Sequence, residues 1–238
     1  MARVVEVDGL PVTLLELGEQ GSPPLLFWHG SGEHARSCEQ SARVLADEDG
    51  LLVYAPDAPG HGRTPPLPYE DYLPSRLAAF AARLLDGVGV AACVWCGFSW
   101  GASVGCRFAA QFPGRTRALA LLEGGHVDFR DLPGFQPPAS LAAAVAADGL
   151  QGALRWGLVQ EPATATYDAL RAAGTPVLLV TATAGRSSLA FDPAERLRAA
   201  VPQATVERLD VPTHELLAHR ARDVARIVGD WLAAHDLV

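Results

Sequence analysis

Gly97-Phe98-Ser99-Trp100-Gly101 decides the fold of this chain, because it joins an apolar run to a helical segment through a very short turn. The pattern G-x-S-x-G lets a serine stand on a sharp strand-to-helix turn with its hydroxyl raised above a sheet. Such a turn strains the backbone at the serine, and residues two positions away must be small. Gly97 and Gly101 meet that need, so we expect a buried strand before Ser99 and a helix after it.

The residues on either side of this turn strengthen the interpretation. Roughly one chain in ten of this composition would contain the pentapeptide by chance, so its context matters. Here an apolar run over 92–96 precedes it and a helical pattern over 102–112 follows it. In that strand–turn–helix order a serine serves as a nucleophile. The alternative is a plain turn of glycine and serine.

A second glycine-rich element, His29-Gly30-Ser31-Gly32, directly follows the apolar run 25–28. Acyl transfer needs donors for a developing oxyanion, commonly one N–H after the nucleophile and one from the loop after the third strand. In this chain these would be the backbone N–H groups of Trp100 and Ser31. We expect His29 to prop the loop. The alternative is an ordinary glycine turn.

The wider pattern alternates short apolar runs with helical stretches. Asp8-Gly9 predicts an opening hairpin. The predicted strands are 4–7, 12–17, 25–28, 51–55, 92–96, 118–122, 177–181 and 205–209, and the predicted helices are 38–47, 72–88, 102–112, 193–200 and 218–234. Strand–helix alternation after a hairpin predicts an α/β fold, with a mostly parallel eight-stranded sheet and helices on both faces.

One interval, 124–173, breaks this alternation, because it is rich in alanine and holds no convincing strand. We expect one domain over 1–238, with this interval as a small helical lid. Its apolar side chains would either line an acyl pocket or form a seam packed on the core. The first case predicts an apolar or neutral acyl substrate, since no basic cluster points to a phosphate or a coenzyme.

Composition limits the classes of partner. The chain has 238 residues, 49% of them hydrophobic, with a net charge of −8 and a pI of about 5.3. An acidic chain does not favour nucleic-acid binding, which needs clustered basic side chains. No segment approaches a membrane span of about 20 apolar residues, and no basic, apolar leader is visible. We therefore expect a cytoplasmic protein; its oligomeric state stays open.

Two of the four cysteines, Cys93 and Cys96, form a C-x-x-C pattern. A redox pair or half of a metal site is the functional interpretation. Both lie in a predicted buried strand, however, where residues three apart point to opposite faces. No second pair completes a zinc site. We expect small core residues in a reducing compartment, with no metal and no cofactor.

With these elements in place, the chain resembles the α/β-hydrolase superfamily over nearly its whole length. The segment Asp57-Ala58-Pro59-Gly60-His61-Gly62-Arg63 is similar to the D-x-P-G-x-G turn that many members carry after the fourth strand. The three motifs occur in the family's order and at similar spacing. The resemblance implies the α/β-hydrolase fold and a structural role for His61.

The resemblance also implies the place of a catalytic base, on the loop between the last strand and the C-terminal helix. His214 lies there, after the predicted strand 205–209 and before the helix 218–234. A serine hydroxyl is a poor nucleophile until a neighbouring imidazole takes its proton. We therefore predict that His214 is the base for Ser99, the alternative being a surface histidine.

The acid of the triad departs from the usual family pattern. Most members carry an aspartate after the seventh strand, but here no carboxylate occurs there before Asp192, which looks like a helix N-cap. Glu123, at the end of the sixth predicted strand, is the favoured substitute, because certain haloalkane dehalogenases and thioesterases of the family carry the acid there. Asp192, Asp128 or the absence of any acid are the alternatives.

These residues predict a serine hydrolase that cleaves a carboxylic ester, lactone or thioester through an acyl-enzyme on Ser99. Dehalogenase and epoxide hydrolase chemistry is not expected, because those members of the family carry aspartate at this turn. Two alternatives stay open. The acyl group could pass to an internal nucleophile, as in a cyclase or acyltransferase of secondary metabolism, or the protein could bind a small molecule without catalysis.

Overall fold

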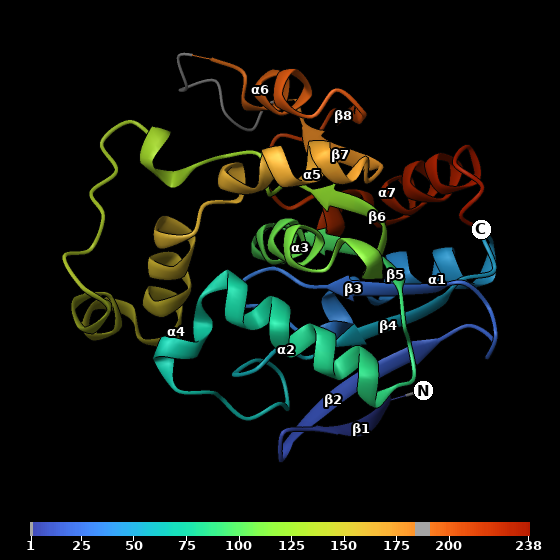
Figure 1. The fold of residues 1–238 in the computed structure, drawn as a ribbon, viewed down its shortest axis with the longest axis horizontal. Helices are drawn as coiled ribbons and strands as arrows, with labels where there is room; N and C mark the ends of the chain where they lie inside the picture. Colours follow the sequence, from blue (N-terminus) through green and yellow to red (C-terminus); the bar gives the residue numbers. More distant parts are fainter. Residues whose placement is uncertain (1, 184–190) are drawn as a thin grey trace.

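The computed structural model describes residues 2–183 and 191–238, and its centre is an eight-stranded sheet (Figure 1). The strands follow the order β1-β2-β4-β3-β5-β6-β7-β8. The two pairs that involve β2 are antiparallel and all the others are parallel. The strands are β1 (Ala2–Val7), β2 (Leu10–Leu17), β3 (Pro24–Trp28), β4 (Leu52–Pro56), β5 (Cys93–Phe98), β6 (Thr116–Leu122), β7 (Val177–Ala182) and β8 (Ala204–Leu209). The predicted fold class is confirmed.

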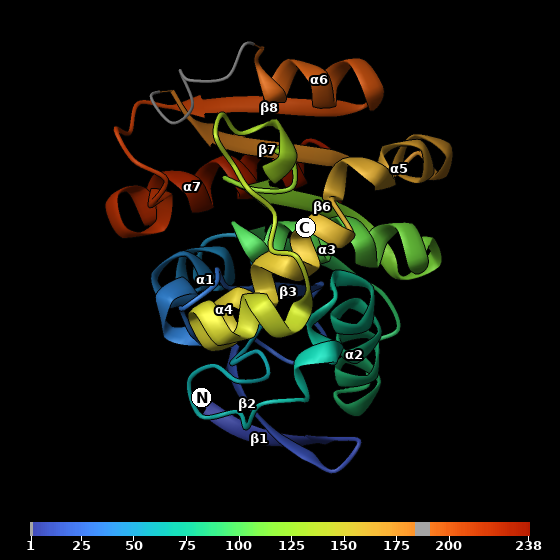
Figure 2. The same cartoon turned by 90° about the vertical axis from the view of Figure 1, so that its left-hand side faces the viewer.

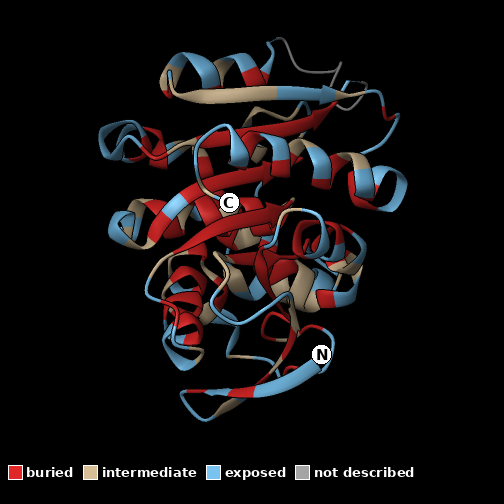
Figure 3. Ribbon diagram, turned by 90° about the vertical axis from the view of Figure 1, so that its right-hand side faces the viewer, coloured by how far each residue is buried: buried red, intermediate tan, exposed pale blue. Residues whose placement is uncertain are grey.

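The first two strands form the hairpin that the sequence predicts at Asp8-Gly9. Both residues have positive φ, 52° at Asp8 and 80° at Gly9, as a tight two-residue hairpin turn requires. Val7 pairs with Leu10 across the turn. This antiparallel hairpin occupies one edge of the sheet, and β8 occupies the other (Figure 3).

Helices cover both faces of the sheet, as Figure 2 shows. One face carries α2 (Pro74–Gly87), α3 (Trp100–Gln111), α5 (Tyr167–Ala173) and α6 (Pro193–Ala200), and the other carries α1 (Glu39–Asp47) and α7 (Leu216–Ala233). The sheet therefore divides the core into two apolar layers. Period-two alternation sends neighbouring strand residues into different layers: Trp95 lies in the first layer and Val94 in the second.

The cysteines follow the same alternation. Cys93 lies in the layer beneath α2 and α3, whereas Cys96 lies in the layer beneath α1 and α7. Both thiols are free and fully buried. The two residues thus point to opposite faces of β5, as the sequence predicts, and cannot share a metal ion or a disulfide.

The interval 124–173, all of which the structure describes, contains no strand. It holds α4 (Leu141–Gln160), α5 and the short helical turns Phe129–Asp131 and Ala163–Thr166. The helix α5 packs on α3 and α6 and so belongs to the helices on that face of the sheet. The helix α4 instead lies across the end of the sheet towards which the parallel strands run (Figures 1 and 2).

A kink that the sequence analysis did not predict divides α4 into two parts. Asp148 (φ −154°, ψ 32°) and Gly149 (φ 49°, ψ −130°) leave helical geometry. The two parts lie close together, because a Cβ atom on Gly152 would be 1.9 Å from the carbonyl oxygen of Ala144. Among the described residues, no helix is long and apolar enough to cross a membrane.

Candidate active site

Ser99 occupies the turn between β5 and α3 in a strained backbone conformation. Its φ is 52° and its ψ is −111°, a region that residues with a Cβ atom rarely adopt. The surrounding backbone holds it there, since the Ser99 N–H donates to the carbonyl of Leu122 at 2.8 Å and its own carbonyl accepts from Ala102 at 3.1 Å. Strain of this kind is typical of functional sites.

Close backbone contacts explain why glycines surround Ser99. A Cβ atom on Gly97 would lie 2.4 Å from the carbonyl oxygen of Gly101, and one on Gly101 would lie 2.3 Å from that of Trp28. The predicted need for small residues at both positions is therefore met. Gly124, which the sequence analysis did not single out, has the same role, because its Cβ would lie 2.2 Å from the Ser99 carbonyl oxygen.

His214 lies beside Ser99, on the loop between β8 and α7. Its Nε2 atom is 2.7 Å from the Ser99 Oγ atom, within hydrogen-bond distance. Its ring also contacts that of Phe98, the last residue of β5, with 5.4 Å between ring centroids. The imidazole is half-exposed, so a substrate can reach the pair from solvent.

Glu123 lies on the other side of this imidazole, directly after β6. Its Oε1 atom is 3.8 Å from His214 Nδ1, and its Oε2 atom accepts hydrogen bonds from the Thr181 hydroxyl (2.9 Å) and the Ala182 N–H (2.6 Å). Burial acts to raise the pKa of Glu123, but the contacts with His214 and Ala182 and the nearby His126 hold that pKa below its usual value. The carboxylate is thus charged and fixed by the end of β7.

The two other candidate acids are engaged elsewhere. Asp192 caps α6 by accepting from the Ala194 N–H at 2.9 Å and pairs with Arg208 at 2.5 Å. Asp128 accepts from the N–H of Arg130 and pairs with its guanidinium group at 2.6 Å. Residues 184–190 of the loop after β7 lie outside the described residues. Of the three candidates, Glu123 is the one beside His214.

Ser31 and Trp100, the predicted oxyanion donors, both line a cavity together with Ser99 and His214. Trp100 is the first residue of α3, where backbone N–H groups have no partner within the helix. The turn that carries Ser31 follows β3 and lies at the same end of the sheet. The structure therefore brings together all five side chains and backbone groups that the sequence predicts for the site.

His29 and His61 are buried next to this site and contact the segments that form it. Within the core, His29 Nδ1 donates to the Gly30 carbonyl (2.7 Å) and Nε2 accepts from the Ala58 N–H (3.0 Å), which links the two glycine-rich turns. Burial lowers the pKa of His29 to about 3, so it stays neutral. His61 stacks on the Trp100 ring at 5.3 Å. His29 thus props the loop as expected, and His61 has a packing position of the kind that the resemblance implies.

The cavity beside Ser99 has a volume of about 440 Å³ and mixed walls. Its lining includes apolar side chains from the interval 124–173, namely Val127, Phe129, Leu132, Leu154 and Leu158. Three polar residues that the sequence analysis missed also line it: Ser103, one turn after Ser99, and Gln151 and Arg155 on α4. Positions 151, 154, 155 and 158 share one helical face, a spacing that could have indicated them.

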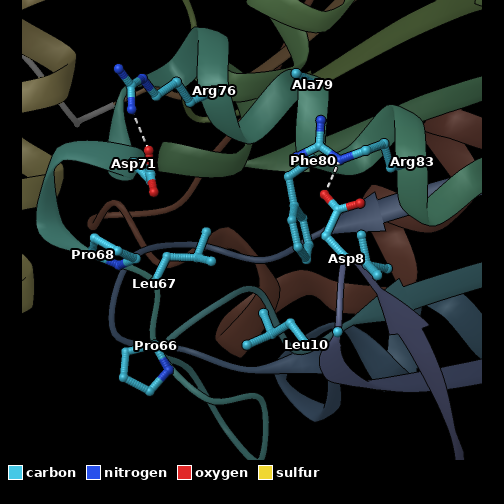
Figure 4. Close-up of a pocket in the computed structure, with 12 residues that line it drawn as sticks. Asp8, Leu10, Pro66, Leu67, Pro68, Asp71, Arg76, Ala79, Phe80 and Arg83 are labelled. Atoms are coloured by element: carbon cyan, nitrogen blue, oxygen red, sulfur yellow. Dashed lines mark hydrogen bonds and ion pairs between the residues drawn. The ribbon is translucent and has the colours of Figure 1, made fainter.

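A second cavity, of about 510 Å³, lies between the β1–β2 hairpin and α2 (Figure 4). Leu10, Leu67 and Phe80 contribute its apolar wall. Its charged side chains are paired with one another, since Arg83 contacts Asp8 at 2.5 Å and Arg76 pairs with Asp71. The two cavities share no lining residue. Over residues 2–183 and 191–238, no three His, Cys, Asp or Glu residues form a group that could hold a metal ion.

Comparisons with known proteins agree with the fold described above. The family model described as the α/β-hydrolase fold matches residues 23–158. Epoxide hydrolase A of Mycobacterium tuberculosis is 37% identical over 121 residues, which are 50% of this chain and 37% of that protein. Lipase LipV of the same organism is 36% identical over 107 residues, or 44% of this chain and 39% of that protein. The matched segments thus span less than two fifths of either relative.

Solved structures extend the likeness to nearly the whole chain. Cfl2 from Burkholderia cenocepacia aligns over 97% of this chain and 95% of its own, with a TM-score of 0.76 and 24% identity. At that identity the likeness shows the fold alone. The family model, however, matches more than half of the sequence, and the chain belongs to the α/β-hydrolase fold family.

Proposed function

We propose that this protein is a serine hydrolase that cleaves a carboxylic ester, lactone or thioester bond. The observation that carries the proposal is the 2.7 Å contact between Ser99 Oγ and His214 Nε2, with the Glu123 carboxylate on the Nδ1 side of the same ring. A nucleophile, a base and an acid in this sequence of contacts form the arrangement that activates a serine hydroxyl.

In the first half of the reaction, Ser99 Oγ attacks the substrate carbonyl carbon while His214 Nε2 takes the hydroxyl proton. The N–H groups of Ser31 and Trp100 donate to the resulting oxyanion. The bond to the leaving group then breaks, and His214 gives its proton to the departing oxygen or sulfur. The acyl group stays on Ser99 as an ester.

In the second half, water replaces the leaving group. His214 takes a proton from the water as its oxygen attacks the acyl carbon, and the same two N–H groups hold the second oxyanion. The bond to Ser99 Oγ then breaks, the serine regains its proton from His214, and the acid leaves. Each half returns the imidazole to its neutral form, so one histidine serves both.

Glu123 orients the imidazole and stabilises its cationic form in this scheme. The distance from Oε1 to Nδ1 is 3.8 Å, longer than a hydrogen bond, and catalytic contacts of this kind commonly tighten when substrate binds. The second carboxylate oxygen accepts hydrogen bonds from Thr181 and Ala182, and the first oxygen faces the histidine.

The cavity supports an apolar or neutral acyl group. Leu154, Leu158 and Phe129 offer apolar surface next to Ser99, and Arg155, a cation of the lining, is paired with Asp148. Resemblance to an epoxide hydrolase does not extend to the nucleophile, because members of the family with that chemistry carry aspartate where this chain has Ser99. The likeness to Lipase LipV fits the proposal better.

A fluorophosphonate probe tests the proposal directly, because it phosphonylates only an activated serine. We expect one adduct per chain, mapped to Ser99 by peptide mass, and no adduct in Ser99→Ala or His214→Ala. Ser103→Ala is the matched control, since it removes another hydroxyl from the same cavity and should still label. Labelling of Ser99→Ala, or an unlabelled wild-type protein that is folded by circular dichroism, would refute the assignment.

A further inference from the structure

Glu33 forms two hydrogen bonds with Gly30, the first residue of the turn that carries Ser31. The Glu33 N–H donates to the carbonyl of Gly30 at 3.3 Å, which makes Gly30–Glu33 a four-residue turn. Gly32, at its third position, has a φ of 76°, as a type II turn requires. The direction of the Ser31 N–H is therefore set by the geometry of this turn.

The side chain of Glu33 also bonds to the first residue of the turn. Its Oε2 atom accepts from the Gly30 N–H at 2.9 Å. Gly30 thus donates to the carboxylate of Glu33 and accepts from the backbone of Glu33, and its carbonyl accepts a further hydrogen bond from His29 Nδ1 at 2.7 Å. These three contacts restrain the two peptide groups of Gly30, the second of which includes the Ser31 N–H.

The surroundings of Glu33 favour a strong contact. The residue is partly buried, and its burial raises the pKa of the carboxyl group above the usual value. Glu215 acts in the same direction, while the Gly30 N–H, His214 and His34 oppose it. A hydrogen bond to a partly desolvated carboxylate is stronger than one in water, so Glu33 is suited to hold a loop.

Gly30 fits between Glu33 and the end of β5 only because it has no side chain. A Cβ atom there would lie 2.9 Å from Phe98 Cδ1 and 3.0 Å from Glu33 Oε2. The Phe98 ring in turn contacts the His214 ring. The turn is thus packed between the Glu33 carboxylate and the aromatic ring next to the base.

We propose that Glu33 is a positioning residue that aims the Ser31 N–H at the substrate oxygen by holding the Gly30 N–H. This inference rests on the proposed function, because it concerns the oxyanion contact of that reaction. An oxyanion donor contributes mainly in the transition state. If the Ser31 N–H loses this orientation, kcat should therefore fall and KM should stay nearly unchanged.

Two substitutions separate the contact from the charge. Glu33→Ala removes the acceptor of the Gly30 N–H, and we expect kcat for a 4-nitrophenyl ester to fall about 10- to 100-fold with KM within about 2-fold. Glu33→Gln keeps an oxygen at the same reach and should restore most of kcat. Glu215→Ala is the matched control, because it removes a nearby negative charge without touching the turn.

A boronic acid provides a readout that a merely structural role would not move. Ser99 Oγ forms a bond to boron as its proton passes to His214 Nε2, the boron becomes a tetrahedral boronate, and a boron-bound oxygen occupies the oxyanion position. We expect Glu33→Ala to lower the affinity for an aryl boronic acid by the same factor as it lowers kcat/KM. Glu33→Gln should restore that affinity. Hydrogen exchange of the Gly30 amide should be faster in Glu33→Ala alone.

The outcomes distinguish this inference from the proposed function. An active wild-type enzyme whose Glu33→Ala variant keeps its kcat and its boronic acid affinity would overturn the role of Glu33 and leave the serine mechanism intact. A Gln variant as slow as the Ala variant would assign the effect to charge and overturn the positioning role. A wild-type protein that takes no fluorophosphonate at Ser99 would overturn both.

Discussion

The Nε2 atom of His214 lies 2.7 Å from the hydroxyl oxygen of Ser99, although 115 positions of sequence separate the two residues. Ser99 follows β5 and His214 follows β8, and parallel strands bring both turns to one end of the sheet. The order of the strands in the sheet therefore brings the two residues together.

The first prediction concerns the nucleophile itself. Ser99→Ala should lower kcat for ester hydrolysis by about 10⁵-fold or more, as expected when the attacking atom of a triad is removed. The fold should stay intact, because the hydroxyl contacts His214 at the half-exposed mouth of the site. Steady-state kinetics and circular dichroism check this. Turnover comparable to wild type in the variant would refute the mechanism.

The strained backbone at Ser99 leads to a second prediction. With φ at 52° and ψ at −111°, position 99 has a conformation that glycine adopts freely and alanine does not. Ser99→Gly should raise the free energy of unfolding by about 1 kcal/mol relative to Ser99→Ala. Urea unfolding of the two inactive variants measures the difference. Equal midpoints would show that the turn carries no strain.

A third prediction separates the candidate acids. Glu123→Gln should lower kcat about 10³- to 10⁴-fold, because the imidazole loses the carboxylate that orients it and stabilises its charge. Asp192→Asn should leave kcat within about 2-fold and stability within about 1 kcal/mol, because asparagine also caps helices well. The kinetics of the two variants, measured side by side, provide the check. The reverse order of effects would assign the acid to Asp192.

The buried His29 predicts how stability depends on pH. Its pKa is about 3 in the folded protein and about 6.5 in the unfolded chain, so only the unfolded chain takes up its proton between these values. The stability that this group contributes is present above pH 6.5 and falls towards pH 3, by up to about 1.4 kcal/mol per pH unit.

Urea unfolding between pH 7 and pH 4 measures this slope. His29→Gln keeps a donor and an acceptor but does not titrate, so its stability should depend less steeply on pH. His61, whose pKa burial also lowers, contributes a slope of the same sign in both proteins. Identical slopes for the wild type and the variant would contradict the buried, neutral state of His29.

A fifth prediction tests the crowding around the nucleophile turn. Gly101→Ala places a Cβ atom 2.3 Å from the Trp28 carbonyl oxygen, whereas a Cβ on Gly114 meets nothing within 4 Å. Gly101→Ala should cost about 1–3 kcal/mol or more, and Gly114→Ala should be neutral or slightly stabilising. Chemical unfolding measures both. A tolerated Gly101→Ala would show that the turn can relax.

The parts of the fold that the sequence predicted are those governed by local pattern. The helix α6 spans Pro193–Ala200, the range predicted from Pro193 and the helical spacing of apolar residues after it. The strand β5, Ser99 and the helix α3 follow one another as the pentapeptide predicts. The place of His214 followed from family resemblance and from the order of elements. Glu123 was favoured because the resemblance implies a triad acid at the end of the sixth strand in certain members of the family, and that strand end lies at the same end of the sheet as His214.

Features that depend on contacts between distant segments were not predicted. Gly124 is needed because its backbone touches Ser99, and nothing in its own neighbourhood of the sequence indicates that contact. Thr181 and Ala182 hold Glu123 from a different strand. The kink at Asp148 and Gly149 lies within the alanine-rich interval for which the sequence predicts only a small helical lid. Such features depend on three-dimensional packing rather than on the period of the sequence.

The four thiols are divided between the two sides of the sheet, so their reactivity can report local opening of each side separately. Cys93 and Cys106 lie in one apolar layer, and Cys38 and Cys96 lie in the other. Burial raises the pKa of all four, so each reacts with a disulfide reagent only when its own layer opens. The order in which the four sites become labelled would therefore reveal which half of the molecule loosens first.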